Sequence, residues 1–470
     1  MKPRNPTLYR NLKQFTEEAI NLIQEKVASP DDIPTRLASK LKTEKEGVWS
    51  IEEVEKPEWG TLIHLHGSHI AQLNSYTSCV RLLQVDTVIA PHLDKLVGIH
   101  GGGAGLVQTS QILPRFITSL LSDSESLSLN QERFDALYKR MEDFFYSQQL
   151  NMRLIAPVIN VTGLRDPTLL TDDVYIVPNS DNRLGQWISD TREGVALVPW
   201  RAVPGLTHSL EHQFTAPKVI VDTTQPGAEE TPVQDSQSPL AVAVNRIERM
   251  VSTLRLLKPD YIAIPFIEHD LLEWHPMPME GNQAPLYPPH WRIFGSRYVL
   301  QEGDVPEIPA LYRALSPELL RKHRFIKVAV QRIERSVEET EPAQRLVDLV
   351  IALEALLLGD IGPAELRGEL AFRLSLRGAY FLARDGMQRR KLYPEFKKAY
   401  QLRSAIVHGD ELPQEVKIFR QRIPIKEFVN RIENHAREVA KRMLLLAKQP
   451  NAPRELVKWD DLVLGATQFD

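Results

Sequence analysis

The chain has 470 residues, too many for one ordinary hydrophobic core, and at about 150 residues per domain this length predicts two or three domains. Hydrophobic residues make up 43% and charged residues 25%, a balance that excludes a disordered or fibrous protein. The sequence lacks an apolar run of about 18 residues and an apolar stretch near its start, which argues against a membrane span and a signal peptide. The single cysteine, Cys79, is typical of a reducing compartment, so we expect a cytoplasmic protein that makes no membrane contact.

The net charge of −4 conceals an uneven distribution along the chain. Residues 311–450 contain 27 Lys and Arg against 18 Asp and Glu, a net charge of +9, and the remaining residues carry −13. A basic region favours a polyanionic partner. Helical regions are also often rich in Lys and Arg on their solvated faces, so the charge alone leaves both interpretations open.

The first 310 residues predict a mixed α and β region. Apolar residues at helical spacing predict helices over residues 9–27 and 130–146, the second with Asn130 as its N-cap. Short β-prone runs, separated by Pro, Gly and Asp, predict strands between and after these helices. The expected strands cover 154–161, 173–178, 195–200 and 218–221.

A polar segment at residues 222–239, DTTQPGAEETPVQDSQSP, has no periodicity and predicts a mobile surface loop that allows two subdomains. The stretch 240–259 predicts a helix, because its apolar residues form one stripe and Pro259 ends it. Residues 260–310 return to short β-prone pieces, with 261–267 and 292–300 as the expected strands.

From Ser316 onward nearly every residue is a helix former, and Ser316 with Pro317 predicts a helix start. Four breaks divide the stretch into five helices of roughly 15 to 25 residues, which suits an up-and-down bundle. The breaks are at Glu341–Pro342, Gly359–Pro363, Asp385–Gly386 and Gly409–Pro424. The predicted fold is multidomain α+β: a mixed α/β region at 1–310, an all-α bundle at 311–450 and a tail at 451–470.

The motif that carries chemistry lies at the end of the fourth helix, in YQLRSAIVHGDEL. Arg403 and His408 differ by about 140° around a regular helix, so they are expected to flank a cleft rather than to stack. Ser404 lies four residues before His408, where its hydroxyl can hold one imidazole nitrogen. Gly409 follows as a C-cap residue that lets the chain turn away from the ring.

An arginine and a histidine so placed can cleave an RNA phosphodiester without a metal ion. The imidazole, with an ordinary pKa of about 6.5, can take the proton of the ribose 2′-OH or protonate the leaving oxygen. The guanidinium can bind the phosphate bidentately, through two parallel hydrogen bonds. The competing interpretation is structural: Arg403 pairs with Glu354 on a neighbouring helix, and His408 only caps its own.

The segment from about Val328 resembles the HEPN superfamily, most closely its Apea-like branch. The resemblance lies in VDLVIALEALLLGD (347–360), ELAFRLSLRGAYFL (369–382) and YQLRSAIVHG (400–409), and covers roughly 120 of the 470 residues. It implies a helical ribonuclease module with Arg403, Ser404 and His408 as catalytic residues. It also implies supporting roles for the acidic residues Glu354 and Asp348.

The resemblance further implies RNA as substrate, a two-fold homodimer through the bundle, and no metal or cofactor. It suggests a toxin or anti-phage defence protein, in which residues 1–310 sense a trigger, such as a phage-derived molecule, or respond to an antitoxin. The alternative from another class is a catalytically silent HEPN module for dimerisation or RNA binding.

Three other patterns were weighed as sites. His64, His66 and His69 could bind a metal, because His64 and His66 stand at alternate positions of a strand and point to one face, although a polar strand face explains that pair equally well. The His100–Gly103 run lacks a nucleophile motif or a phosphate-loop lysine, so we expect only a flexible loop. Arg201 and His208 cannot share a helix, because Pro204 and Gly205 lie between them.

Overall fold

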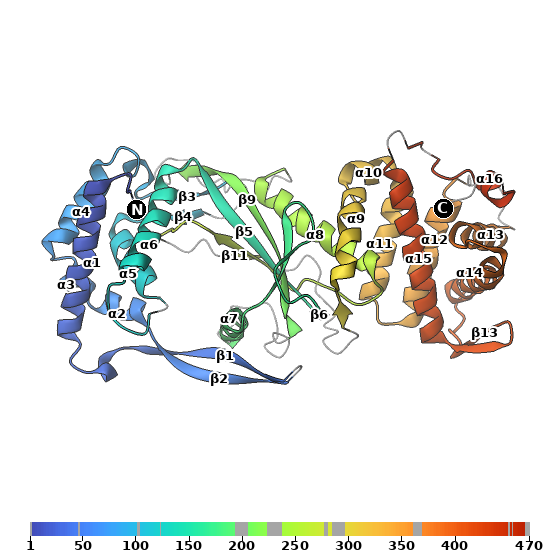
Figure 1. Cartoon of the computed structure of the whole chain (residues 1–470), viewed down its shortest axis with the longest axis horizontal. Coiled ribbons are helices and arrows are strands. Elements are labelled where there is room, and N and C mark those ends of the chain that lie inside the picture. Colours follow the sequence, from blue (N-terminus) through green and yellow to red (C-terminus); the bar gives the residue numbers. More distant parts are fainter. Residues whose placement is uncertain are drawn as a thin grey trace. The chain divides into compact units, whose positions relative to one another are not determined.

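The computed structural model describes residues 2–45, 48–100, 104–122, 124–192, 205–222, 237–276, 281–283, 297–360, 369–449, 452–453 and 455–465. The chain mixes helices and strands and forms two compact units (Figure 1). The first comprises Met1–Pro157, Ile176–Ile247 and Pro265–Leu286, and the second Val158–Tyr175, Glu248–Ile264 and Tyr287–Asp470. Each unit is therefore assembled from three stretches of chain, whereas the sequence-based division has single boundaries at 310 and 450.

In the described part of the first unit, six α-helices come before strand β5 in the chain. Helix α1 starts where the Asn5 side chain accepts the Leu8 N–H at 2.9 Å, and α6 starts where Asn130 accepts the Arg133 N–H at 3.0 Å. The predicted helices at 9–27 and 130–146, and the Asn130 cap, are thus confirmed. These six helices are α1 (Pro6–Lys26), α2 (Trp59–Leu65), α3 (Gly67–Ile70), α4 (Asn74–Val85), α5 (Thr109–Leu121) and α6 (Gln131–Tyr146).

The strands of the first unit form one larger sheet with neighbour order β11-β10-β5-β9-β3-β4, in which β8 also pairs with β9. The antiparallel pairs within it include β3 with β9 and β5 with β10. The strands of this sheet that belong mainly to the first unit are β3 (Leu96–Ile99), β4 (Ala104–Leu106), β5 (Gln149–Val158), β8 (Val174–Pro178), β9 (His208–Val221), β10 (Ile267–Leu271) and β11 (Gly281–Gln283). Helix α8 (Pro239–Leu257) follows β9 in the chain and confirms the helix predicted at 240–259.

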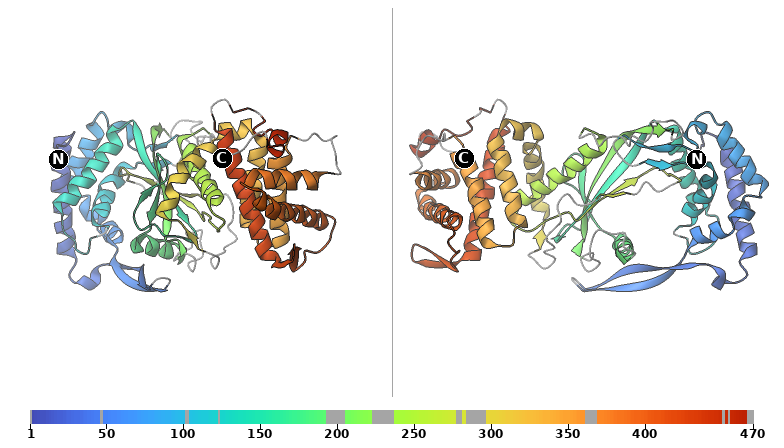
Figure 2. Two further views of the ribbon diagram at one scale, coloured as in Figure 1. Left: turned by 45° about the vertical axis from the view of Figure 1, so that its right-hand side comes forward. Right: turned by 180° about the vertical axis from the view of Figure 1, so that it is seen from behind.

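A separate antiparallel hairpin, β1 (Thr35–Lys45) with β2 (Val48–Pro57), extends from the helices toward α7 (Asp181–Arg192), as Figures 1 and 2 show. The Ser39 N–H donates to the Ser189 hydroxyl at 3.1 Å. A Cβ atom on Gly185 would lie 2.1 Å from the Ser39 carbonyl oxygen, so only glycine permits this approach of helix to strand.

The second unit is mainly helical in the ranges that the structure describes. Its helices are α9 (Ile308–Ala314), α10 (Pro317–Lys322), α11 (Arg324–Glu338), α12 (Pro342–Leu358), α13 (Leu370–Leu382), α14 (Gly386–Val407), α15 (Ile425–Ala447) and α16 (Trp459–Val463). Its strands are β6 (Val161–Thr162), β7 (Thr168–Leu169), β12 (Tyr298–Val299), β13 (Glu415–Ile418) and β14 (Gln421–Pro424). Strand β12 runs parallel to β6, and β13 and β14 form a hairpin.

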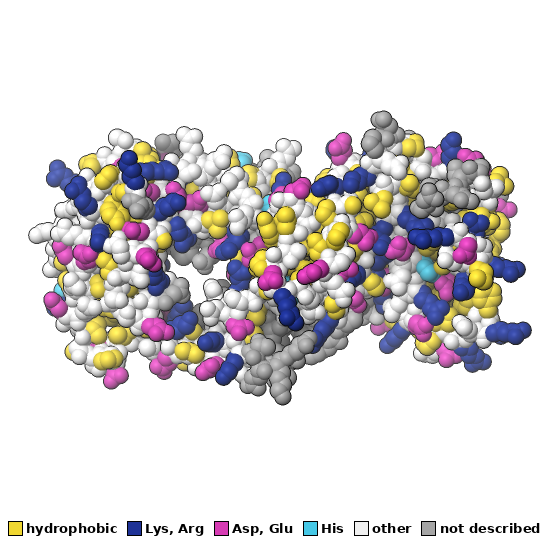
Figure 3. Space-filling view, viewed as in Figure 1, with side chains coloured by type: hydrophobic (Ala, Val, Ile, Leu, Met, Phe, Trp, Pro, Cys, Tyr) yellow, Lys and Arg dark blue, Asp and Glu magenta, His cyan; other side chains and the backbone are white. Residues whose placement is uncertain are grey.

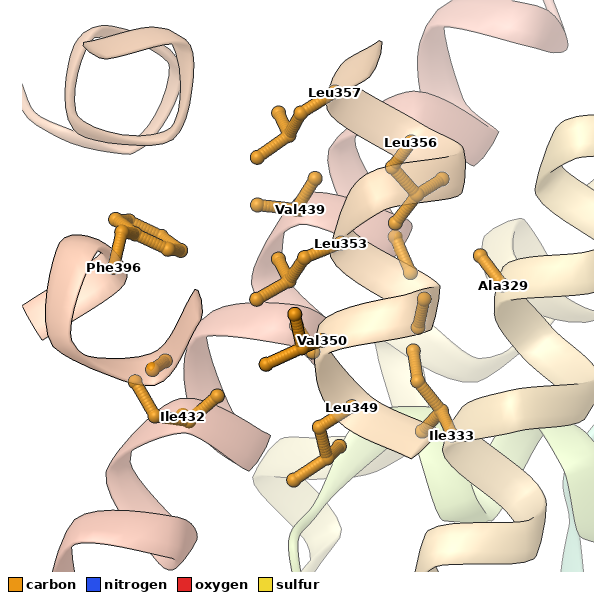
Figure 4. Close-up of a cluster of buried hydrophobic side chains, with 14 of the residues drawn as sticks. Ala329, Ile333, Leu349, Val350, Leu353, Leu356, Leu357, Phe396, Ile432 and Val439 are labelled. Carbon is orange, nitrogen blue, oxygen red and sulfur yellow. The ribbon is translucent and has the colours of Figure 1, made fainter. Parts of the chain in front are cut away.

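Helix α12 lies at the centre of this unit and contacts α11, α13, α14 and α15. Figure 4 shows Leu349, Val350 and Leu353 of α12 among side chains of the neighbouring helices. These three residues are completely buried. Two of these neighbouring helices, α13 and α14, pack closely against each other. A Cβ atom on Gly378 of α13 would lie 2.9 Å from the ring of Phe396 on α14, so glycine at this position permits the close approach.

An ion-pair cluster is buried where α15 meets the end of α8. Glu433 and Arg437 are each only 2% exposed, and their Oε1 and Nη2 atoms lie 2.5 Å apart without hydrogen-bond geometry. The Arg437 Nε donates to the Arg255 carbonyl oxygen at 2.7 Å, and Arg345 pairs with Glu433 from α12. Two guanidinium groups thus depend on one buried carboxylate.

Several sequence predictions need correction. The predicted strand pattern around His64 and His66 is wrong, because this segment forms α2 and the start of α3. The predicted strand at 261–267 is wrong except at its last residue, where β10 begins. The first C-terminal helix is broken at His323 into α10 and α11, and the expected break at Gly409–Pro424 contains the β13–β14 hairpin.

Other predictions have mixed outcomes. The predicted strand at 173–178 is confirmed by β8, and 218–221 is the end of the longer β9. The Ser316 cap is confirmed, since its hydroxyl accepts the Leu319 N–H at 3.3 Å. The segment 195–200 and nearly all of the predicted loop at 222–239 lie outside the described residues. Within the described ranges, no helix combines the length and the apolar character needed to cross a membrane.

Glu433→Ala should destabilise the protein by about 3–5 kcal/mol, because it leaves the buried Arg437 and the half-buried Arg345 without a counter-charge. Glu427→Ala is the matched control: it removes a carboxylate of the same helix that also accepts from an arginine, Arg431, but is 54% exposed. The control should cost less than about 1 kcal/mol. Urea unfolding followed by circular dichroism measures both, and equal losses would contradict the role of the buried cluster.

Candidate functional site

Helix α14 places Arg403 and His408 at its C-terminal end. His408 is the C-cap residue, and its N–H donates to the Ser404 carbonyl oxygen at 3.1 Å. Gly409 then takes φ +98°, a left-handed conformation that suits glycine and turns the chain off the helix axis. The His408 side chain is exposed, whereas Arg403 and Ser404 are half-buried. The helix end thus presents one imidazole to solvent and directs one guanidinium inward.

Glu354 of α12 holds the guanidinium of Arg403. The Arg403 Nη2 atom lies 3.4 Å from Oε2 of Glu354, and the two side chains are 26% and 23% exposed. Burial raises the pKa of Glu354, and the positive charge of Arg403 opposes that rise. The Arg403 Nε is buried and has no hydrogen-bond partner among the described residues. One long contact leaves much of the guanidinium's donor capacity unused.

Tyr400 belongs to the same cluster, although the sequence analysis did not identify it. It lies three residues before Arg403, on the same face of α14, and is half-buried. Burial raises the pKa of Tyr400, and the Glu354 carboxylate raises it further. Its three-residue spacing from Arg403, which places both side chains on one face of a helix, could have identified Tyr400 from the sequence.

The expected link between Ser404 and His408 is limited to the backbone. Within the described ranges, no hydrogen bond joins the Ser404 hydroxyl to the imidazole, so the proposed orienting role stays a prediction. The exposed residues Lys397 and Gln401 lie within about 60° of Ser404 and His408 around the helix. His408 therefore ends a polar stripe along α14. Figure 3 shows only that Lys and Arg side chains are interspersed with Asp and Glu on the face in view.

Asp348 lies apart from this cluster. It is 5% exposed, and its oxygens lie 2.7 Å from Nη1 of Arg332 and 3.5 Å from Nε of Arg335, both on α11. A separation of six residues from Glu354 places the two carboxylates about 120° apart around α12. The structure therefore brings Glu354 together with Arg403 and directs Asp348 to another helix.

Within the part of the chain that the structure describes, the other candidate residues do not come together to form a site. His64 and His69 are exposed on α2 and α3, and among the described residues no three His, Cys, Asp or Glu side chains are arranged to hold a metal ion. His208 lies buried in β9, and Arg201 lies outside the described residues. The glycines that follow His100 lie outside them as well.

Glu354→Gln should change how stability depends on pH. The pKa of Glu354 is raised above its usual value of 4.5, so the folded chain keeps this proton to higher pH than the unfolded chain. The contribution of Glu354 is therefore fully present below about pH 4.5 and is lost as pH rises through the raised pKa. In thermal unfolding from below pH 4.5 upward, the melting temperature should fall less with rising pH in Glu354→Gln than in the wild type. Glu411→Gln, an exposed carboxyl group, is the control, and identical pH profiles for Glu354→Gln and wild type would contradict this prediction.

No protein-family model matches the chain, and no curated protein or solved structure is significantly similar to it. The described residues place together a guanidinium, a carboxylate that holds it and, at the same helix end, an exposed imidazole. These groups are the basis for assigning a function.

Proposed function

We propose that this protein is a metal-independent endoribonuclease of the HEPN type, with residues 311–450 as its helical catalytic module. The observation that carries the proposal is the exposed imidazole of His408 at the end of α14, in the same last turns as Arg403. A histidine buried and bonded within its own chain would have favoured a purely structural role. The four helices around α12 support the all-α bundle, to which the β13–β14 hairpin adds a short β element.

In this mechanism His408 removes the proton of the ribose 2′-OH or protonates the 5′ leaving oxygen. Arg403 binds the phosphate and stabilises the charge of the transition state, for which its unused donors are suited. Glu354 fixes the direction of that guanidinium through α12, and Ser404 orients the ring. Asp348 supports the module indirectly, because its ion pairs hold α11 against α12.

One histidine cannot easily donate and accept a proton in the same step, so the active form is a two-fold homodimer that places two motifs around one phosphate. Val407 supports this arrangement, because it is 58% exposed immediately before His408. An apolar side chain at that position is suited to contact a second copy.

In the same proposal, residues 1–310 sense a trigger or restrain the nuclease, as in toxin or anti-phage defence systems, and an antitoxin or a phage-derived molecule is the corresponding partner. This assignment rests on the family resemblance. The second candidate is a catalytically silent HEPN module for dimerisation or RNA binding. The Arg403–Glu354 contact favours this candidate, since a paired arginine at a capped helix end also has a purely structural explanation.

His408→Ala and Arg403→Ala should each abolish cleavage of RNA in EDTA and leave helical circular dichroism unchanged, because both residues lie at a helix end. Cleavage by the wild type should leave 2′,3′-cyclic phosphate and 5′-OH ends and spare RNA with a 2′-O-methyl group at the cut site. Ser404→Ala should lose only the effect of an orienting hydrogen bond, about 0.5–1.5 kcal/mol. The exposed stripe residue Gln401→Ala is the matched control.

Three results would contradict this mechanism: 5′-phosphate ends, activity only with added Mg²⁺, or inactive variants that have also lost helix. Wild-type protein that binds RNA without cutting it would instead support the silent module.

Val407→Glu should convert the dimer to monomers and abolish cleavage, because it buries a charge at the proposed two-fold contact. Leu445→Glu is the control, since Leu445 is another partly exposed apolar residue, 44% exposed on α15. Light scattering coupled to size exclusion measures the mass of each protein. A wild type that is monomeric and fully active would overturn the dimer.

A further inference from the structure

A pocket of about 440 Å³ opens in the first unit, lined by residues of α6, of strands β5 and β9, and of the segment that follows β10. Helix α6 and both strands are labelled in Figure 1. The pocket belongs wholly to this unit, whereas Arg403, Ser404 and His408 belong to the second. Its volume falls in the range of about 300–1,000 Å³ that is usual for small-molecule sites.

Glu273 supplies a buried carboxylate to this pocket, since it is only 5% exposed. The Asn151 backbone N–H lies 3.1 and 3.0 Å from its two oxygens, and the Asn151 Nδ2 donates to Oε1 at 2.6 Å. Among the residues that the structure describes, no basic side chain forms an ion pair with Glu273. The Lys218 ammonium acts on Glu273 only from beyond ion-pair distance and donates instead to two carbonyl oxygens at the end of α6. Because a carboxylate can accept about four hydrogen bonds, Oε2 has capacity for a further donor, and a cationic group suits it.

Arg140 supplies a positive charge at the rim of the pocket. Its side chain is exposed, and its Nε donates to the Leu272 carbonyl oxygen at 2.9 Å, which holds the guanidinium beside the residue that precedes Glu273. Within the described ranges its two Nη atoms form no hydrogen bond or ion pair, so their N–H donors are available to an anion. The pocket's other acidic residue, Asp143, lies 3.5 Å from Nη2 of Arg4 and is counterbalanced by it. The pocket therefore offers one positive and one negative charge to a ligand.

An apolar wall completes the pocket. Phe214 and Leu272 line it, and both are half-buried. Because side chains alternate along a strand, Phe214 shares a face of β9 with Lys218, whose ammonium donates to carbonyl groups of α6. The Phe214 ring therefore lies on the face of β9 that is turned toward α6, where it offers an apolar surface to a ligand.

We propose that this pocket binds a free α-amino acid with an apolar side chain. Its ammonium group donates to Glu273, its carboxylate accepts from Arg140, and its side chain packs against Phe214. A cation alone would be repelled by the guanidinium, and an anion alone would be repelled by the buried carboxylate. An α-amino acid carries both charges on one carbon atom, so a single small ligand satisfies both groups.

The test is calorimetric titration of the full chain with leucine and with two analogues that each lack one charged group. The analogue 4-methylpentanoate lacks the ammonium group, and 3-methylbutylamine lacks the carboxylate. Leucine should bind, and each analogue should bind about 10- to 100-fold more weakly, because it loses a hydrogen bond between charged groups.

Arg140→Ala and Glu273→Gln should each weaken leucine binding by about 10- to 100-fold. Arg140→Ala should not weaken 3-methylbutylamine, which has no carboxylate for the guanidinium to bind. Glu273→Gln keeps a carbonyl oxygen for the Asn151 N–H, so its circular dichroism should match that of the wild type. Lys139→Ala and Glu132→Gln are the controls, because they change exposed charges of α6 outside the pocket and should leave the affinity for leucine unchanged.

Two results would overturn the ligand class: no binding of leucine, or an affinity for leucine no greater than that for either analogue. An affinity for leucine that is unchanged in Arg140→Ala and Glu273→Gln would refute this pocket as the site. Because binding is measured without RNA, a failure of the proposed nuclease activity would leave this test intact.

Discussion

The second unit depends on the burial of α12 among four neighbouring helices. Each fully buried leucine or valine on this helix contributes about 1.5–3 kcal/mol, and such side chains occupy nearly every turn. The apolar side chains of α12 determine which of its faces are buried. Two ion pairs add to this constraint, because Asp348 faces the arginines of α11 and Glu354 faces Arg403 of α14.

The geometry of the candidate site follows from that constraint. Arg403 contacts a residue of the central helix, whereas His408 is the C-cap residue and its side chain is exposed to solvent. A guanidinium beside a carboxylate, with an exposed imidazole at the same helix end, suits a group that binds phosphate and a group that transfers protons. The same arrangement would also serve a silent module, and RNA cleavage separates the two.

Local sequence signals predicted the elements whose ends carry strong caps or prolines. Asn130, Ser316 and Pro342 marked helix starts correctly, since their effects act within one turn. The break at His323 could not be predicted in this way, because its neighbours are helix formers and the burial of its ring is a property of the folded chain. The strand predicted around His64 is wrong because Trp59, Leu62 and Ile63 form the buried face of a helix. The helical spacing of these apolar residues was a stronger signal than the alternation of His64 and His66.

The same distinction applies to the site. Arg403 and His408 lie on one helix, so their spacing predicted that they share its end. The roles of Glu354 and Asp348 depend on which neighbouring helix each one faces, and only the packing of α12 determines that. Tyr400 was missed because a tyrosine on a helix face is usually an ordinary packing residue, and its proximity to Glu354 is a tertiary contact.

The hydrogen bond from Arg437 to the Arg255 carbonyl has a consequence for how the protein is made. It joins residues 182 positions apart, and the carbonyl that accepts it belongs to the end of α8. During synthesis the ribosome releases α8 long before α15 exists, so this part of the second unit waits for most of the chain to emerge. A polypeptide interrupted before α15 would lack the last wall of the α12 core. Premature termination would therefore yield an incomplete helical unit, and any activity of the α14 site would arise only late in translation.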